Sequence, residues 1–451
     1  MREKEFLGKE KIGTLLRKFA IPSIVAMLVS ALYNIVDQFF IGQKVGTLGI
    51  AATNVAFPLN TMCTSMGLLV GIGCSSIFNI TMGKGDRKKA TFYYGNGAVL
   101  LLLEGSLLMI VTQFFLSPML MFFGATDNVI DYAKQYTSIT SFGFPFLVYS
   151  LGGGHLVRAD GSPTYAMLCN LSGAIVNTIL DALLINVFDM GMRGAAIATI
   201  IGQMVSATMV FCYMRRCKSI ELKSEHLILK FKYVADIVKL GIGPFTNQLA
   251  MLVVQIVLNK SLNRYDTISG PNEAIPLTVA GIITKVNMLY LSVVIGLSQG
   301  MQPIASFNFG AHKYDRVKEV YKLVLKCGLT ASVIAFAAFQ VFTMPIIRFF
   351  GEGSQAYYDF AAKYFHIYLF FTFLNCIQPA SSTFFTSIGD SVKGAFLSLT
   401  RQTLFLLPLI AVLPIFFGID GIMYAGPIAD FMAAVVAIIM IRSTLKKLDA
   451  K

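Results

Sequence analysis

Residues 19–41 read FAIPSIVAMLVSALYNIVDQFFI, with one acidic side chain, Asp37, and no Lys or Arg. A helix of this length extends about 35 Å, which exceeds the roughly 30 Å thickness of the hydrocarbon core of a bilayer. A core helix of a soluble domain seldom carries so long an apolar run. The stretch therefore predicts a helix that spans a membrane.

Further apolar stretches of about 20 residues or more follow along the chain. Together they predict twelve spans, near 19–41, 50–80, 93–116, 129–157, 164–187, 194–214, 234–259, 274–308, 319–343, 357–388, 394–417 and 421–441. The composition agrees, because 55% of the 451 residues are hydrophobic, 14% are charged and the mean hydropathy is +0.68. Soluble domains carry about 25% charged residues, so a soluble multidomain enzyme and a disordered chain are excluded. We expect an all-α polytopic membrane protein.

The formal net charge is +13, which in a soluble protein would suggest nucleic-acid binding. If the N-terminus is cytoplasmic, 26 of the 37 Lys and Arg residues lie in cytoplasmic segments and five lie in outer loops. This asymmetry is the positive-inside pattern. It predicts a multi-pass protein of the cell (inner or plasma) membrane with both termini in the cytoplasm, and it makes a nucleic-acid partner unnecessary.

The two halves of the chain resemble each other. At an offset of 229 residues, Gly67 and Gly71 coincide with Gly296 and Gly300, and these spacings suit close helix packing. A duplication of six spans predicts two six-helix lobes related by a pseudo-two-fold axis along the membrane normal. The expected organisation is a cytoplasmic N-terminal segment (1–18), an N-lobe (19–214), a cytoplasmic linker (215–233), a C-lobe (234–441) and a cytoplasmic tail (442–451).

A few ionisable side chains lie well inside the spans. Inserting each into the bilayer costs a few kcal/mol of free energy, so each is a candidate for a functional role. They are Asp37, Glu104, Asp181, Lys285, Arg401 and Asp430. Asp37 and Asp181 lie at matching heights, about 28 and about 27 Å above the cytoplasmic ends of their spans. Thr199 reaches nearly the same height, with Gln203 one turn deeper.

These residues have the chemistry of a cation site. Tyr33 precedes Asp37 by four residues, and Asn177 precedes Asp181 by four, so each pair shares a helix face. Carboxylate, amide and hydroxyl oxygens suit Na⁺. Without a cation, two neighbouring carboxylates should not both be ionised, so one should hold a proton.

We therefore predict a Na⁺ or H⁺ site at Asp37, Asn177, Asp181 and Thr199. Tyr33 and Gln203 are expected to support it. The alternative is that each aspartate only bonds neighbouring helices. Glu104 has two interpretations, a substrate contact or a hydrogen bond between helices.

Four motifs together resemble the MATE (multidrug and toxic compound extrusion) transporters, above all the MepA-like members near the DinF branch. They are Tyr33 to Asp37, Arg158 to Pro163 (RADGSP), Asn177 to Asp181, and Gly194 to Thr199 (GAAIAT). The resemblance covers residues 10–445. It implies a cation-coupled multidrug antiporter, not an enzyme, that exports amphipathic and often cationic compounds by alternating access. It also assigns the cation-binding roles to Asp37, Asn177, Asp181 and Thr199, and a hinge to Pro22.

The expected partners are small-molecule drugs or toxins and membrane lipids. We expect a monomer with no cofactor beyond the coupling ion, Na⁺ or H⁺. The alternative is a lipid-linked oligosaccharide flippase of the same superfamily. Such a protein needs a cationic central cavity, for which Lys285 and Arg401 are the deep basic candidates.

Overall fold

The structure is a computed structural model that describes residues 5–268, 275–350 and 353–449. All regular structure in these residues is helical, which confirms the all-α class. The first half contains α1 (Glu5–Lys9), α2 (Ile12–Lys44), α3 (Thr47–Gly83), α4 (Arg87–Phe114), α5 (Leu116–Phe122), α6 (Ile130–Thr140), the 3-10 turn η1 (Ser141–Gly143), α7 (Phe144–Ala159), α8 (Pro163–Asp181), the π-helical turn η2 (Ala182–Val187) and α9 (Gly191–Met214).

The linker contains the short 3-10 turn η3 (Ser224–Leu227), and the second half of the chain follows it. This half contains α10 (Phe231–Arg264), α11 (Ile275–Gly310), α12 (Tyr314–Val341), α13 (Thr343–Phe350), α14 (Gln355–Tyr368), the 3-10 turn η4 (Thr372–Leu374), α15 (Ile377–Ser387), α16 (Ser391–Leu399), the π-helical turn η5 (Thr400–Leu406), α17 (Leu407–Phe417) and α18 (Ile419–Asp449).

Within the described residues, 11 helical stretches are long and apolar enough to cross a membrane. The expected span at 129–157 is not one of them, because it is built from α6 and α7 with η1 between them. Pro145 stands in the first turn of α7, and its missing N–H prevents α6 from continuing unbroken into α7. Several helices also extend past the expected spans, since a helix continues where hydropathy falls near the headgroups.

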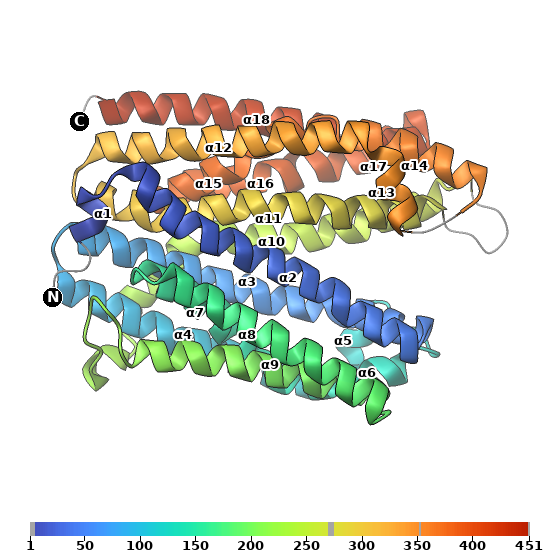
Figure 1. The fold of residues 1–451 in the computed structure, drawn as a ribbon, viewed down its shortest axis with the longest axis horizontal. Helices are drawn as coiled ribbons and strands as arrows, with labels where there is room; N and C mark the ends of the chain where they lie inside the picture. Colours follow the sequence, from blue (N-terminus) through green and yellow to red (C-terminus); the bar gives the residue numbers. More distant parts are fainter. Residues whose placement is uncertain (1–4, 269–274, 351–352, 450–451) are drawn as a thin grey trace.

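The long helices run side by side in two groups, with α2–α9 in one lobe and α10–α18 in the other (Figure 1). Each lobe has its own buried apolar core, containing Phe78 and Tyr94 in the N-lobe and Tyr321 and Phe384 in the C-lobe. Both ends of the chain lie at one end of the molecule, which we call the termini side (Figure 1). The opposite end is the far side.

The lobes contact each other where α2 and α3 pack against α10 and α11. Glycines allow this approach. A Cβ atom at Gly300 would lie 2.6 Å from the Cα atom of Ala20, and Gly296 packs equally closely against Ile24. The predicted role of these glycines in close packing is confirmed, although Gly71 meets Gly152 within the N-lobe.

A polar contact also joins the lobes along this line of contact between α2 or α3 and α11, which we call the seam. The side-chain amide of Gln302 in α11 donates hydrogen bonds to the hydroxyls of Ser75 (2.8 Å) and Ser76 (2.9 Å) in α3. All three side chains are buried. Because these residues lie in the half of each helix nearer the termini side, this side of the lobe interface is closed.

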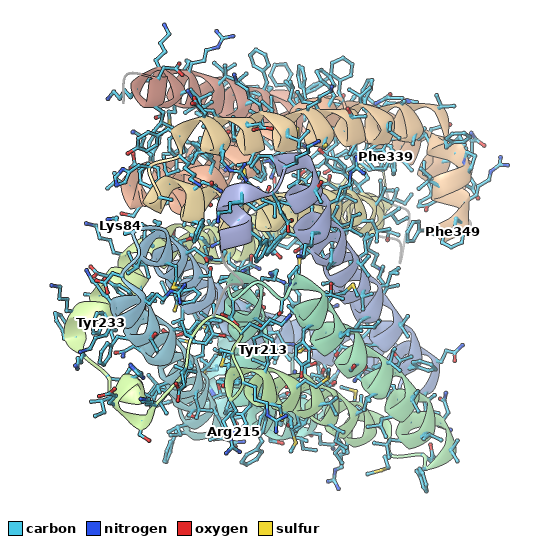
Figure 2. All side chains as sticks on the ribbon, turned by 60° about the vertical axis from the view of Figure 1, so that its left-hand side comes forward. Lys84, Tyr213, Arg215, Tyr233, Phe339 and Phe349 are labelled. Atoms are coloured by element: carbon cyan, nitrogen blue, oxygen red, sulfur yellow. The ribbon has the colours of Figure 1, made fainter. Side chains whose placement is uncertain are left out.

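The linker between the lobes is anchored to the turn between α7 and α8. The buried carboxylate of Asp160 accepts hydrogen bonds from the Lys218 N–H (2.7 Å) and the Tyr213 hydroxyl (2.8 Å). It also accepts from Ser219. Tyr213 lies at the end of α9, just before the linker (Figure 2). The linker therefore follows the N-lobe surface closely.

Large exposed side chains show where lipid meets the protein. Phe114, Phe122 and Phe349 are almost fully exposed and lie at the ends of α4, α5 and α13. Phe349 lies at the far side of the molecule (Figure 2). Phe231, at the start of α10, is exposed toward the termini side. Exposed phenylalanine rings of this kind suit contact with lipid rather than with water.

Candidate cation site

Three neighbouring helices of the N-lobe carry the predicted site. Helix α2 packs against α8, and both contact α9. Asp37 lies near the far end of α2, Asp181 is the last residue of α8, and Thr199 lies two turns into α9. The π-helical turn η2 begins directly after Asp181. Such turns widen a helix locally and recur at functional sites.

The structure brings the two carboxylates together. The side chains of Asp37 and Asp181 lie near each other, without a hydrogen bond between them. Tyr33 and Tyr136 both adjoin this pair, and both also adjoin Thr199. The cluster therefore joins residues from α2, α6, α8 and α9.

Several buried oxygens of the cluster have no hydrogen-bond donor among the described residues. They are Oδ1 of Asp37, both carboxylate oxygens of Asp181 and Oδ1 of Asn177. Asp181 is 0% exposed and Asn177 is 2% exposed. The hydroxyl of Thr199 donates to the Ala195 carbonyl (2.9 Å), so its oxygen can still serve as a ligand.

These orphaned oxygens fit a small hard cation or a proton. Two carboxylates in contact inside a protein repel each other unless one is protonated or a cation lies between them. The donor set of Asp37, Asn177, Asp181 and Thr199 consists of oxygens, as Na⁺ requires. A proton shared by Asp37 and Asp181 satisfies the same two carboxylates.

Two predicted supporting residues make no hydrogen bond with the cluster. Gln203 is one turn beyond Thr199 in α9, and its Oε1 atom lies against Gly143, the last residue of η1, with no partner in the described chain. Glu104 lies in α4, which packs mainly on α3 and α7 rather than on the helices of the cluster. Its buried Oε2 atom has no hydrogen-bond partner within the described ranges.

Pro22 lies inside α2, where it interrupts the backbone ladder at the lobe interface. Its missing N–H leaves the carbonyl of Lys18 without the usual helical partner. Its neighbours Ala20 and Ile24 contact the glycines of α11. A weakened point of α2 thus lies on the seam between the lobes.

Sequence reasoning missed Tyr136. It lies in α6, before the break at η1, and adjoins Asp37, Asp181 and Thr199. A tyrosine near the outer end of a broken span has no spacing relation to the four predicted ligands. Its place could be found only from the packing of α6 against α9.

The buried acid of the C-lobe has a built-in counterion. Nε of Arg401, in η5, lies 2.5 Å from Oδ1 of Asp430, in α18. Asp430 is buried, and Tyr368 and Asn375 adjoin the pair. Lys285 is exposed. The C-lobe acid is thus neutralised by a side chain rather than by an exchangeable ion.

Comparison with known proteins places the chain in a family. The MatE family model matches residues 22–183 and 247–412, once in each lobe. The chain is 24% identical over 443 residues to "Multidrug export protein MepA" of Staphylococcus aureus (strain N315), covering 97% of this chain and 95% of that protein. It is also 24% identical over 447 residues to the protein of the same name from Staphylococcus saprophyticus, with the same coverage.

Solved structures show the same fold. One, described as the outward-facing conformation of a multidrug resistance MATE family transporter of the MOP superfamily, has a TM-score of 0.92 at 19% identity, with both chains fully covered. A MATE structure in the bent conformation has a TM-score of 0.90, also at 19% identity, with 100% of this chain and 99% of that chain covered. The expected two-lobe, twelve-span fold is confirmed. The chain belongs to the MatE family, and it is a multi-pass membrane transporter rather than an enzyme.

Proposed function

We propose that this transporter exports amphipathic, often cationic, small molecules in exchange for Na⁺ or H⁺. The observation that carries the coupling is the set of orphaned oxygens at Asp37, Asn177 and Asp181. The names of the relatives support multidrug export as the transport activity. The protein acts as a monomer in the cell membrane.

The termini side faces the cytoplasm in this proposal, in keeping with the basic residues of the connecting segments. The seam at Gly300 and Gln302 then closes the cytoplasmic side of the lobe interface. The structure therefore corresponds to an outward-facing state, in which the cluster in the far half of the N-lobe receives its ion from outside.

Coupling follows from different affinities in two states. A bound cation or proton removes the repulsion between Asp37 and Asp181, and a cation also draws the oxygens of Thr199 and Asn177 onto itself. A drug that binds the outward-facing state less well in the presence of that ion is released outside. Only such a difference in affinity between states moves the equilibrium. Pro22 lets α2 bend at the seam as the lobes move between the two states.

The test uses single neutralising substitutions. We expect Asp37→Asn and Asp181→Asn each to abolish efflux of a cationic dye from cells, because each removes a charge that the ion must replace. Asp189→Asn is a matched control, since this exposed carboxylate lies outside the cluster and pairs with Lys44 (3.0 Å). Normal efflux by both cluster variants, at matched expression, would refute the site.

The flippase alternative keeps one of its two basic candidates. It needs free cationic groups in the central cavity, and Arg401 is neutralised by Asp430, which leaves Lys285 alone. We therefore favour drug export.

A further inference from the structure

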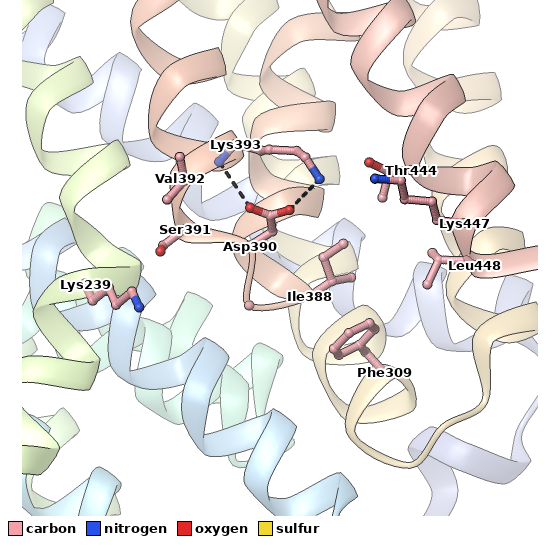
Figure 3. Close-up of a pocket in the computed structure, with 11 residues that line it drawn as sticks. Lys239, Phe309, Ile388, Asp390, Ser391, Val392, Lys393, Thr444, Lys447 and Leu448 are labelled. Carbon is pink, nitrogen blue, oxygen red and sulfur yellow. Dashed lines mark hydrogen bonds and ion pairs between the residues drawn. The ribbon is translucent and has the colours of Figure 1, made fainter. Parts of the chain in front are cut away.

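A cavity of about 440 Å³ opens on the termini side of the C-lobe, away from the cation cluster (Figure 3). Four segments line it. Lys239 comes from α10 and Phe309 from α11, residues 388–393 form the turn between α15 and α16 with the start of α16, and residues 444–448 of α18 contribute Thr444, Lys447 and Leu448.

The cavity carries net positive charge. Its lining includes three lysines, Lys239, Lys393 and Lys447, and one carboxylate, Asp390. That carboxylate is already occupied, because Lys393 Nζ lies 2.7 Å from its Oδ2 atom and the Lys393 N–H donates to its Oδ1 atom (3.2 Å). Lys239 and Lys447 have no partner in the described part of the chain. They lie on opposite sides of the segment from Asp390 to Lys393 (Figure 3).

A buried hydroxyl also lacks a partner. Thr444 is only 6% exposed, and its Oγ1 atom makes no hydrogen bond with any described residue. It lines the same cavity. The first turn of α16 borders it as well, and the N–H groups of Ser391 and Val392 precede the first intrahelical hydrogen bond. A hydroxyl, two free ammonium groups and a helix N-terminus together suit a phosphate group.

An exposed apolar strip adjoins the cavity. Val392, in its lining, is 75% exposed, and Phe396 follows one helical turn later and is 48% exposed. The stretch of α10 that is long and apolar enough to span a membrane begins at Phe231, which places this end of the C-lobe near the headgroup region. A free phosphate ion would leave the apolar strip of Val392 and Phe396 uncovered.

We propose that this cavity binds one anionic phospholipid from the adjacent leaflet. The headgroup lies across the segment from Asp390 to Lys393, with Lys239 on one side and Lys447 on the other, and its phosphate accepts hydrogen bonds from the Thr444 hydroxyl and the start of α16. The acyl chains run along Val392 and Phe396. Basic pockets between spans at the cytoplasmic face recognise anionic headgroups in this way.

The test measures binding of phosphatidylglycerol to the full-length protein in detergent by native mass spectrometry. Each of Lys239→Gln and Lys447→Gln should weaken binding about fivefold, and the double variant about 25-fold, since a lysine near the headgroups contributes about 1 kcal/mol. Thr444→Val should weaken it several-fold. Lys446→Gln is the matched control, because Lys446 is adjacent to Lys447 but does not line the cavity.

Two further arms distinguish the sources of phosphate. Phosphatidylcholine should bind at least tenfold more weakly than phosphatidylglycerol, and inorganic phosphate should not displace the lipid at millimolar concentration. Val392→Asn with Phe396→Asn should weaken lipid binding while leaving thermal stability unchanged. The proposal is overturned if the double lysine variant binds phosphatidylglycerol normally, if Lys446→Gln weakens binding equally, or if inorganic phosphate competes fully.

Discussion

The closed seam between the lobes depends on the absence of a side chain at Gly300. An alanine there would place its Cβ atom 2.6 Å from the Cα atom of Ala20. Carbon atoms in contact lie about 3.5–4.0 Å apart, so α2 and α11 would have to separate by about 1 Å. Overpacking of this kind costs about 1–3 kcal/mol.

This cost applies only while the seam is closed, so Gly300→Ala should shift the lobes toward the state that is open on the termini side. A bias of about 2 kcal/mol changes the ratio of the two states roughly 30-fold. The assay is labelling of a Ser75→Cys reporter in the detergent-purified protein by a hydrophilic thiol reagent. Ser75 is buried at the seam, 2.8 Å from Gln302. The exposed Cys212 and Cys327 are first replaced by serine.

We expect Gly300→Ala to raise the labelling rate of Ser75→Cys by about the same factor, roughly 30-fold, because the reagent reaches this position only when the seam opens. Gly281→Ala is the matched control, since Gly281 lies in the same helix with no atom near its missing side chain. Unchanged labelling in Gly300→Ala, or an equal rise in Gly281→Ala, would show that close packing at Gly300 does not hold the seam closed.

Three other predictions concern stability and motion. Arg401→Met should lower the free energy of unfolding by about 3–5 kcal/mol, because it leaves Asp430 buried without a partner, whereas Arg401→Met with Asp430→Leu should recover most of this loss. Thermal unfolding in detergent measures both variants, and an equal loss in the two would contradict the ion-pair interpretation. Asp160→Ala should release the linker from the α7–α8 turn and speed cleavage of the linker in limited proteolysis about tenfold, because hydrogen bonds to a carboxylate contribute about 1.5–3 kcal/mol. An unchanged cleavage pattern would count against an anchoring role for Asp160. Pro22→Ala restores a backbone hydrogen bond in α2 and should slow dye transport while leaving dye binding intact, so normal transport would argue against the hinge.

The sequence alone locates the principal acids of the site. Asp37 and Asp181 stand out because a carboxylate in an apolar span is costly, and helix rise is enough to place both at one height. The structure brings them together on α2 and α8. Close packing at Gly296 and Gly300 was equally predictable from their spacing, since a missing side chain leaves a regular gap on a helix face.

What the sequence could not supply is the partner of each residue. Arg401 and Asp430 are 29 residues apart, and only the packing of η5 against α18 makes them an ion pair. Tyr136 joins the cluster because a break at η1 orients α6 toward α9. Both depend on how separate helices pack, which hydropathy and spacing do not encode.

Ion binding at Asp37 and Asp181 drives export in the mechanism proposed for this transporter. The most direct measurement is transport of a cationic dye by the purified protein in liposomes, with Na⁺ and pH gradients imposed separately. We predict dye movement under at least one inward cation gradient, and none when Asp37 or Asp181 is replaced by Asn. Dye movement under neither gradient, or equal movement by the wild type and both variants, would contradict the account.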